Sequence, residues 1–167
     1  MKNRPVKLKN SGSLVNYLMG HNDSVPEVGK GATICHWSDR DAYEVLEFDE
    51  KKKTVVIQRY VPKRIDNNGM GDSQTYEYKE LTGSKITLYF KWGSWKTKHK
   101  KFVFTDEALK KYGTNYKTMH EEFKAQGGKY AGAFIGSEVK GLTRSKNEWN
   151  SVNIIFGIKQ EFYDFTF

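Results

Sequence analysis

The sequence predicts a mainly β (α+β) fold, built as a small SH3-like or strongly curved β-barrel. Seven or eight short segments alternate apolar and polar residues with a period of two, and turn-forming residues separate them at short intervals. The 167 residues fit one domain, whose predicted β core spans 26–104 and 152–167. We expect an N-terminal arm with a short helix over 1–25, and a helical and loop insertion over 105–151.

The N-terminal region carries one helix signal. Residues 1–10 resemble a basic arm, and a short helix is predicted over 13–19. Ser13 can act as its N-cap, and Gly20 can end it because glycine readily adopts the left-handed conformation that closes helices.

The β core is predicted from alternation and from turn residues. In the strongest segment, Val55 and Ile57 share one face. Pro62 should end that strand, because proline lacks the N–H that a sheet requires. Turns are predicted at 66–69 and around Gly83, and Gly93 interrupts the alternation again. The predicted strands are 32–37, 42–48, 53–60, 74–79, 85–91, 102–104, 152–158 and 161–167.

Two helices are predicted near 105–126, within the insertion. The first has Thr105 as its N-cap, two acids in its first turn, and a stop at Gly113. In the second, Thr118 and Glu121 have the spacing of a capping box. The stretch 129–150 remains ambiguous, because glycines interrupt it repeatedly.

The composition excludes several classes of protein. The lone Cys35 cannot form an internal disulfide, so a disulfide-stapled secreted fold is excluded. No apolar segment follows the basic N-terminus, and no apolar run approaches the roughly 20 residues of a membrane span. We therefore expect a cytoplasmic protein without a membrane partner.

The net charge of +8 is distributed unevenly. The stretches 51–65 and 85–101 hold 12 of the 28 lysines and arginines and no acid. Such an asymmetry favours an electropositive face and an anionic partner. The alternative is a solvated surface that protects β edges from aggregation.

Motifs of known catalytic sites are missing from the sequence. It has no phosphate-binding loop, no dinucleotide-binding glycine pattern and no nucleophile turn. Its four histidines lie at no metal-ligand spacing from one another or from Cys35. We therefore expect no cofactor and no metal, and the sequence favours a binding protein over an enzyme. A hydrolase built around Asp39 and Asp66 stays open as an alternative.

Two polar clusters could form a ligand site. One is the mixed turn 37–41, where Arg40 could present its planar guanidinium to a phosphate. The other runs from Lys63 to Tyr78 and combines cations with tyrosines, as nucleotide sites do. Each cluster could instead be structural, as a turn that pairs with itself or a hairpin with packed tyrosines. The candidate ligand-binding residues are Trp37, Ser38, Asp39, Arg40, Gln58, Lys63, Arg64, Asp66, Gln74 and Tyr76.

A third cluster could bind nucleic acid, because tryptophans interleaved with lysines can offer rings on which bases stack beside a row of cations that contacts phosphates. The alternative is a hairpin tip whose lysines keep an edge soluble while the indoles cap the core. The candidate residues are Lys91, Trp92, Trp95, Lys96, Lys98, Lys100 and Lys101.

Several of these segments also resemble a family of small tailed-phage or prophage proteins of unassigned function. The resemblance covers 26–91 and 161–167 and rests on a G-x-G-A-T opening, S-D-R-x-A, a V-x-Q strand, N-G-M…Q-x-Y-x-Y and a terminal Y-D-x-x-F. This chain departs from the pattern at Tyr60, where the family usually has Asp, and its stretch 105–150 is longer than the family's usual length allows. The resemblance implies a phage or prophage origin and a compact barrel, but no activity.

Three functions are therefore open. The first is a phage-encoded, non-enzymatic binder of a small anionic, nucleotide-like ligand, which could sequester a host immune signal in the cytoplasm of an infected bacterium. The second is a nucleic-acid-binding β-barrel module, and the third is the hydrolase. The first is favoured because dispersed polar residues such as Asp39, Gln74 and Tyr76 suggest a pocket more than a groove. A homo-oligomer is compatible with each of them.

Overall fold

The computed structural model describes residues 22–71 and 73–165. The helix predicted over 13–19 and the basic arm lie outside them. The elements in chain order are β1 (Gly31–Cys35), β2 (Arg40–Asp49), β3 (Thr54–Arg64), β4 (Tyr76–Lys91), β5 (Ser94–Phe104), α2 (Asp106–Tyr112), α3 (Tyr116–Ala125), β6 (Tyr130–Ala131), β7 (Phe134–Ile135), β8 (Thr143–Ser151) and β9 (Ile154–Phe156).

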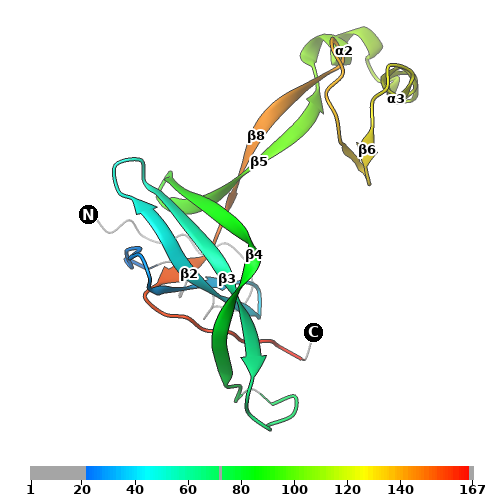
Figure 1. Ribbon diagram of the computed structural model, residues 1–167. Helices are drawn as coiled ribbons and strands as arrows, with labels where there is room; N and C mark the ends of the chain where they lie inside the picture. The colour runs from blue at the N-terminus through cyan, green and yellow to red at the C-terminus, as the bar shows by residue number, and fades with distance from the viewer. Residues whose placement is uncertain (1–21, 72, 166–167) are drawn as a thin grey trace. The chain divides into compact units, whose positions relative to one another are not determined.

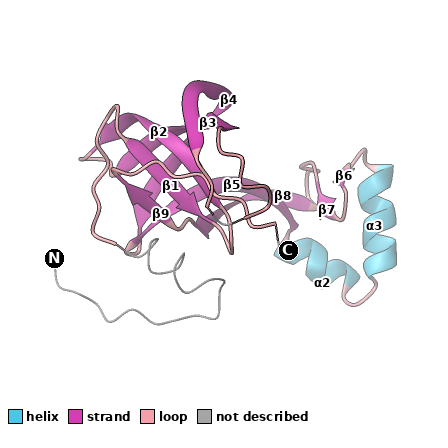
Figure 2. Cartoon of the chain, turned by 90° about the horizontal axis from the view of Figure 1, so that it is seen from below, coloured by secondary structure: helices cyan, strands magenta, loops and turns pink. Residues whose placement is uncertain are grey.

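The chain forms two compact units. The first comprises the described residues up to Thr97 together with those from Ser151 onward, and the second is Lys98–Asn150. The second unit therefore occupies the part of the sequence where the insertion is predicted, and it also takes in most of β5 and β8. Figures 1 and 2 show these elements along the chain.

The fold is mainly β, as predicted. Hydrogen-bonded neighbours in the main sheet follow the order β8-β5-β4-β3-β2-β1-β9. Among the described residues no pairing joins β8 to β9, so the prediction of a closed barrel is wrong. Side chains bond the outer edge of β9 instead: Phe156 N donates to Ser24 Oγ at 2.8 Å, and Asn22 Nδ2 donates to the Ile154 carbonyl at 3.2 Å. These two bonds satisfy backbone groups of this edge without another strand.

The first unit is built around one face of this sheet. Val55 and Ile57 are both fully buried, which confirms the face predicted for them. Burying each such aliphatic side chain contributes roughly 1.5–3 kcal/mol. The buried cluster consists of Ala32, Ile34, Tyr43, Val45, Val55, Ile57, Leu88, Ile154 and Phe156.

Two predicted strand ends are wrong, because bulges absorb the residues that were expected to stop the strands. Pro62 lies inside β3, at a register shift between Val61 and Pro62, where the ladder is irregular and tolerates a missing N–H. Gly83 lies inside β4, in a second shift opposite Arg59. Both strands therefore continue well beyond their predicted limits.

The hairpin between β4 and β5 confirms the interruption predicted at Gly93. Lys91 pairs with Ser94, so the loop has two residues, Trp92 and Gly93. Their φ angles of 52° and 78° are both positive, as a type I′ turn requires.

The second unit contains the helices. Thr105 caps α2, its Oγ1 accepting from Ala108 N at 3.1 Å, and Gly113 follows the helix with a φ of 57°, so both predicted ends are confirmed. The capping box predicted at Thr118 is wrong. The N-cap of α3 is Asn115, whose Oδ1 accepts from Thr118 N at 3.2 Å, so the helix begins earlier. A separate core holds this unit together: Ala108, Met119, Phe123, Val139 and Leu142.

After β9, the chain continues along the first unit as an irregular segment, Gly157–Phe165, which we call the C-terminal segment. Thr33 binds it twice, because its Oγ1 donates to the Ile158 carbonyl at 2.9 Å and accepts from Gln160 N at 3.0 Å. The approach is close at Gly31, where a Cβ atom would lie 2.8 Å from the backbone nitrogen of Lys159. Only glycine lets the segment pass at this distance.

We expect Gly31→Ala to lower the free energy of unfolding by about 1–3 kcal/mol, the range typical of overpacking, because the methyl group meets backbone. Gly83→Ala is the matched control, since no atom lies within 4 Å of a Cβ placed there. Urea denaturation of both variants measures the difference. Equal stability of the two variants would mean that the C-terminal segment does not pass over Gly31.

Candidate functional site

Four of the ten predicted ligand residues contact the C-terminal segment: Asp39, Arg40, Arg64 and Gln74. Arg40 exchanges two backbone hydrogen bonds with Phe162, at 2.9 and 3.0 Å, and its guanidinium carbon lies 5.4 Å from that ring's centre. Asp39 Oδ1 accepts from Asp164 N at 2.8 Å. The turn 37–41 therefore holds the C-terminal segment, and Arg40, which was expected to hold a phosphate, contacts Phe162 through its backbone and its guanidinium.

Gln74 binds the same segment from the other side. Its Oε1 accepts from Tyr163 N at 3.0 Å, and its Nε2 donates to the Tyr163 carbonyl at 2.6 Å. The side-chain amide thus makes the two hydrogen bonds that the backbone of one residue in a neighbouring strand would make. Tyr76 orients it, because the Tyr76 hydroxyl donates to the same Oε1 at 2.8 Å.

Arg64 and Asp66 form a pair that shapes the β3–β4 loop. Asp66 receives two bonds from Arg64 Nε, at 2.9 and 3.1 Å, one from Arg64 Nη2 at 2.8 Å, and further bonds from the backbone N–H groups of Asn68 and Thr75. The hydrogen bonds from Arg64, and then those from the backbone, hold the pKa of Asp66 well below its usual range. A carboxylate so firmly ionised is unsuited to general acid or base chemistry near neutral pH, which argues against the hydrolase.

The remaining ligand candidates do not join these residues. Gln58 Nε2 donates to the Thr82 carbonyl of β4. Trp37 and Lys63 are exposed, and Ser38 is half-buried. Most of the polar groups that a nucleotide would need therefore bond to other groups of the chain. They fit the alternative prediction for both clusters, in which these residues have a structural role.

An ion cluster of four residues, none of them predicted as a site residue, lies in this region. Arg59 Nη2 lies 2.8 Å from both Asp41 Oδ1 and Glu161 Oε1, and His36 Nε2 lies 3.0 Å from Asp41 Oδ2. The Glu161 side chain is only 9% exposed, and burial raises its pKa against the opposing effect of Arg59. Glu161 Oε2 also accepts from Ala42 N at 2.9 Å. The cluster therefore fastens the C-terminal segment to β2 and β3.

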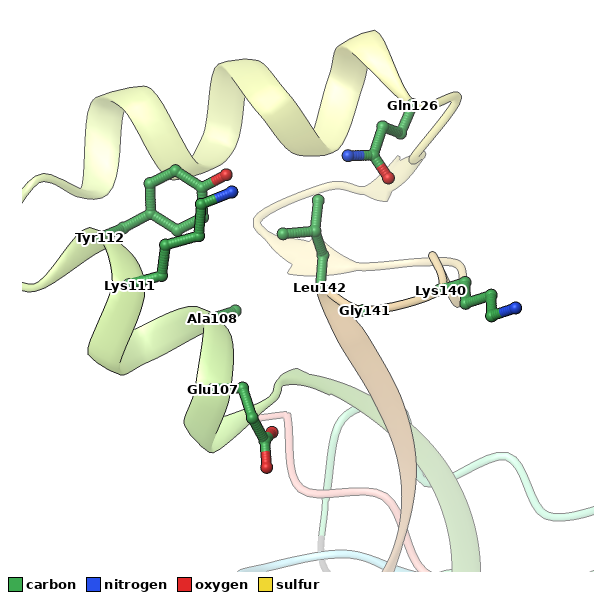
Figure 3. A pocket seen from close by; sticks show the side chains of 8 residues that line it. All are labelled: Glu107, Ala108, Lys111, Tyr112, Gln126, Lys140, Gly141 and Leu142. Atoms are coloured by element: carbon green, nitrogen blue, oxygen red, sulfur yellow. The ribbon is translucent and has the colours of Figure 1, made fainter.

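A shallow cavity lies within the second unit (Figure 3). Its volume is about 230 Å³, below the roughly 300–1,000 Å³ of most small-molecule sites. Figure 3 shows Lys111 and Lys140 on opposite sides of Leu142, so the two cations do not converge on one point. The lining residues are Glu107, Ala108, Lys111, Tyr112, Gln126, Lys140, Gly141 and Leu142. This geometry does not support an anion pocket.

The third predicted cluster divides into two parts. Trp95 packs against the core of the first unit, with its ring edge-on to those of Phe90 and Phe156, so it cannot serve as a stacking platform. Lys96 is only 9% exposed, and its Nζ donates to Ser151 Oγ at 2.7 Å. Trp92 is 77% exposed, at the hairpin tip. Trp95 therefore fits the alternative prediction for this cluster, in which an indole caps the core.

Beyond Thr97 the strands form a different surface. Thr97 of β5 lies opposite Leu88 of β4, and β8 is the other neighbour of β5 in the sheet. We call the two lengths Lys98–Phe104 and Thr143–Asn150 the basic ribbon. Its lysines and arginines are all exposed: Lys98, Lys100, Lys101, Arg144 and Lys146. It contains a single acid, Glu148.

Contacts within the basic ribbon pair its cations with neighbouring side chains. Lys98 Nζ lies 5.8 Å from the ring centre of Trp149, and Lys100 Nζ lies 5.5 Å from that of Phe102. Lys101 Nζ lies 3.3 Å from Glu148 Oε1, with both side chains about half exposed. An ion pair this exposed contributes at most about 1 kcal/mol, so it leaves Lys101 able to change partners.

Comparisons with protein-family models, with curated proteins and with solved structures returned no match. The resemblance to small phage proteins therefore stays a prediction. Within residues 22–71 and 73–165, no three His, Cys, Asp or Glu side chains gather as metal ligands would, and no helix is long and apolar enough to cross a membrane.

Asp66→Asn should lower the melting temperature at neutral pH, because the amide cannot accept all the bonds that the carboxylate receives. A carboxyl group whose pKa is lowered by folding stabilises the protein above its unfolded pKa of about 3.9, and this stability disappears as the pH falls further. The difference in melting temperature between wild type and variant should therefore shrink below about pH 4. Asp23→Asn is the exposed control, and a difference that does not depend on pH would contradict the assignment.

Gln74→Glu should loosen the C-terminal segment, since a carboxylate cannot donate to the Tyr163 carbonyl and repels it. We expect a loss of about 1 kcal/mol in the free energy of unfolding, the usual contribution of a hydrogen bond. Hydrogen exchange should become faster at the amides of Tyr163 and Asp164. Met70→Ala, an exposed change in the same loop, should leave exchange at these amides unchanged.

Proposed function

We propose that this protein binds nucleic acid and contacts the phosphate backbone through the basic ribbon. The observation that supports it is the charge of the ribbon: five exposed lysines and arginines and one glutamate on two short adjacent strands. Basic stripes of this kind are the electrostatic footprint of nucleic-acid-binding surfaces. This is the second of the functions that the sequence leaves open.

The spacing of the cations supports the same proposal. Alternate residues of a strand lie about 6.6–7 Å apart, and adjacent strands about 4.8 Å apart. Both spacings are shorter than the Debye length of about 8–10 Å at physiological salt, so these charges repel one another. A polyanion relieves this repulsion and gains free energy by releasing its own condensed counterions.

A small anionic ligand is less well supported. The groups expected to bind it, such as Asp39, Gln74 and Asp66, bond to the chain itself. That function stays a prediction, and mass spectrometry of molecules released from the purified, heat-denatured protein tests it. A nucleotide recovered in equimolar amount would favour sequestration.

The triple variant Lys98→Gln, Lys100→Gln, Lys101→Gln tests the proposed site. Each phosphate contact contributes about 0.9 to the slope of log K against log salt for duplex DNA, so the slope should decrease by roughly 2–3. Fluorescence anisotropy with labelled DNA and RNA, at several salt concentrations, measures it.

The matched control, Lys51→Gln, Lys63→Gln, Lys85→Gln, removes the same charge from exposed sites of the first unit. It should leave the slope nearly unchanged. Equal slopes in the two triple variants, or no binding even at low salt, would exclude the proposed function. Circular dichroism melts of both proteins show whether they remain folded.

A further inference from the structure

We infer that the nucleic acid is B-form duplex DNA and that the basic ribbon enters its major groove. This inference rests on the proposed function and names the class of nucleic acid that the ribbon fits. It follows from three features of the ribbon: its width, the placement of cations on both of its faces, and the contacts made by its aromatic rings.

The width of the ribbon suits one kind of groove. Two adjacent strands place their backbones about 4.8 Å apart, and the major groove of B-DNA, about 12 Å wide, admits a two-stranded β-ribbon. The major groove of A-form RNA is deep and narrow and excludes such a ribbon. The six residues Lys98–Val103 extend about 20 Å at 3.3 Å each, enough to follow a groove past several base pairs.

Both faces of the ribbon carry cations. Side chains alternate along a strand, so Lys98 and Lys100 share one face and Lys101 lies on the other. The contact of Lys98 with Trp149 places that indole on the first face. Arg144 and Lys146, which alternate with Trp149, therefore lie on the second face.

This two-sided charge distinguishes a groove from a flat surface. A ribbon that lies on a flat anionic surface needs cations on one face only. Inside a groove, phosphates line both walls, and a ribbon between them meets negative charge on each side. The distribution of Lys98 and Lys100 opposite Lys101, Arg144 and Lys146 matches the groove.

The aromatic rings of the ribbon argue against a single strand as the partner. Proteins that bind single strands offer aromatic faces on which bases stack. Here the lysine ammonium groups lie over the rings of Trp149 and Phe102, at 5.8 and 5.5 Å. Lysines therefore occupy the ring faces on which bases would stack, and the rings hold these cations in positions to contact phosphate.

The test compares three labelled 20-base probes of one sequence: duplex DNA, duplex RNA and single-stranded DNA. We expect the full-length protein to bind duplex DNA at least about tenfold more tightly than the other two, since only B-DNA admits the ribbon. Methyl green, which occupies the major groove, should displace the protein, and netropsin, which occupies the minor groove, should not. Guanine N7 atoms should be protected from methylation over the bound site.

A variant that should bind more tightly gives a further test, because misfolding would weaken binding and could not strengthen it. Glu148→Gln removes the single acid of the ribbon and releases Lys101, so affinity for duplex DNA at low salt should rise by roughly two- to fivefold. Glu138→Gln, which removes an exposed acid of the same unit outside the ribbon, is the matched control and should have a smaller effect.

Two results would overturn the inference while leaving the proposed function intact. One is binding to RNA or to single-stranded DNA as tight as binding to duplex DNA, with a salt slope that still depends on Lys98, Lys100 and Lys101. The other is displacement by netropsin and not by methyl green. If no nucleic acid binds, or if binding ignores those lysines, the proposed function itself fails.

Discussion

The place of β5 between β4 and β8 in the sheet is the constraint on which the candidate surface depends. Up to Thr97, β5 lies between β4 and β8 as an ordinary member of the sheet, and its Trp95 contributes to the core. From Lys98 to Lys101 every residue of β5 is exposed, so this length of the strand carries charge on both of its faces. One strand thus changes from a core element to a charged ribbon without a break in its hydrogen-bonded backbone.

In the first unit the polar residues have a different task. Gln74 and Asp39 bind a segment whose described residues have no regular strand pairing beyond a single bridge, and Glu161 of that segment binds Ala42 of β2. Side chains thus supply the hydrogen bonds that a ladder otherwise would. Their clustering looks like a ligand site in the sequence because both tasks need the same chemistry: charged and amide groups gathered around one extended chain. Only the structure shows that the extended chain is the protein's own C-terminal segment.

How far the sequence predicts the structure depends on the range of the interactions. Val55 and Ile57, Gly93 and the Thr105 cap were predicted correctly, because alternation, positive φ and capping are local. Pro62 and Gly83 were misjudged, since a bulge depends on the partner strand. The Arg59–Glu161 pair joins residues 102 positions apart and leaves no local signal. β8 stayed ambiguous because a strand exposed on both faces shows no alternation of apolar and polar residues.

The charge of the ribbon also needs to be weighed against the simpler view that lysines only protect an exposed strand edge. Protection against edge-to-edge association requires charge, but of either sign. Alternating signs would protect equally well and would add cross-strand pairs that stabilise a ribbon by about 0.2–1 kcal/mol each. The ribbon instead holds five cations and one acid, Glu148, while Asp106 outside it lies 3.9 Å from Arg144, so the ribbon forgoes most of that stabilisation. A surface that keeps unfavourable like-charge contacts, with lysines held over Trp149 and Phe102, is explained better by an anionic partner than by solubility.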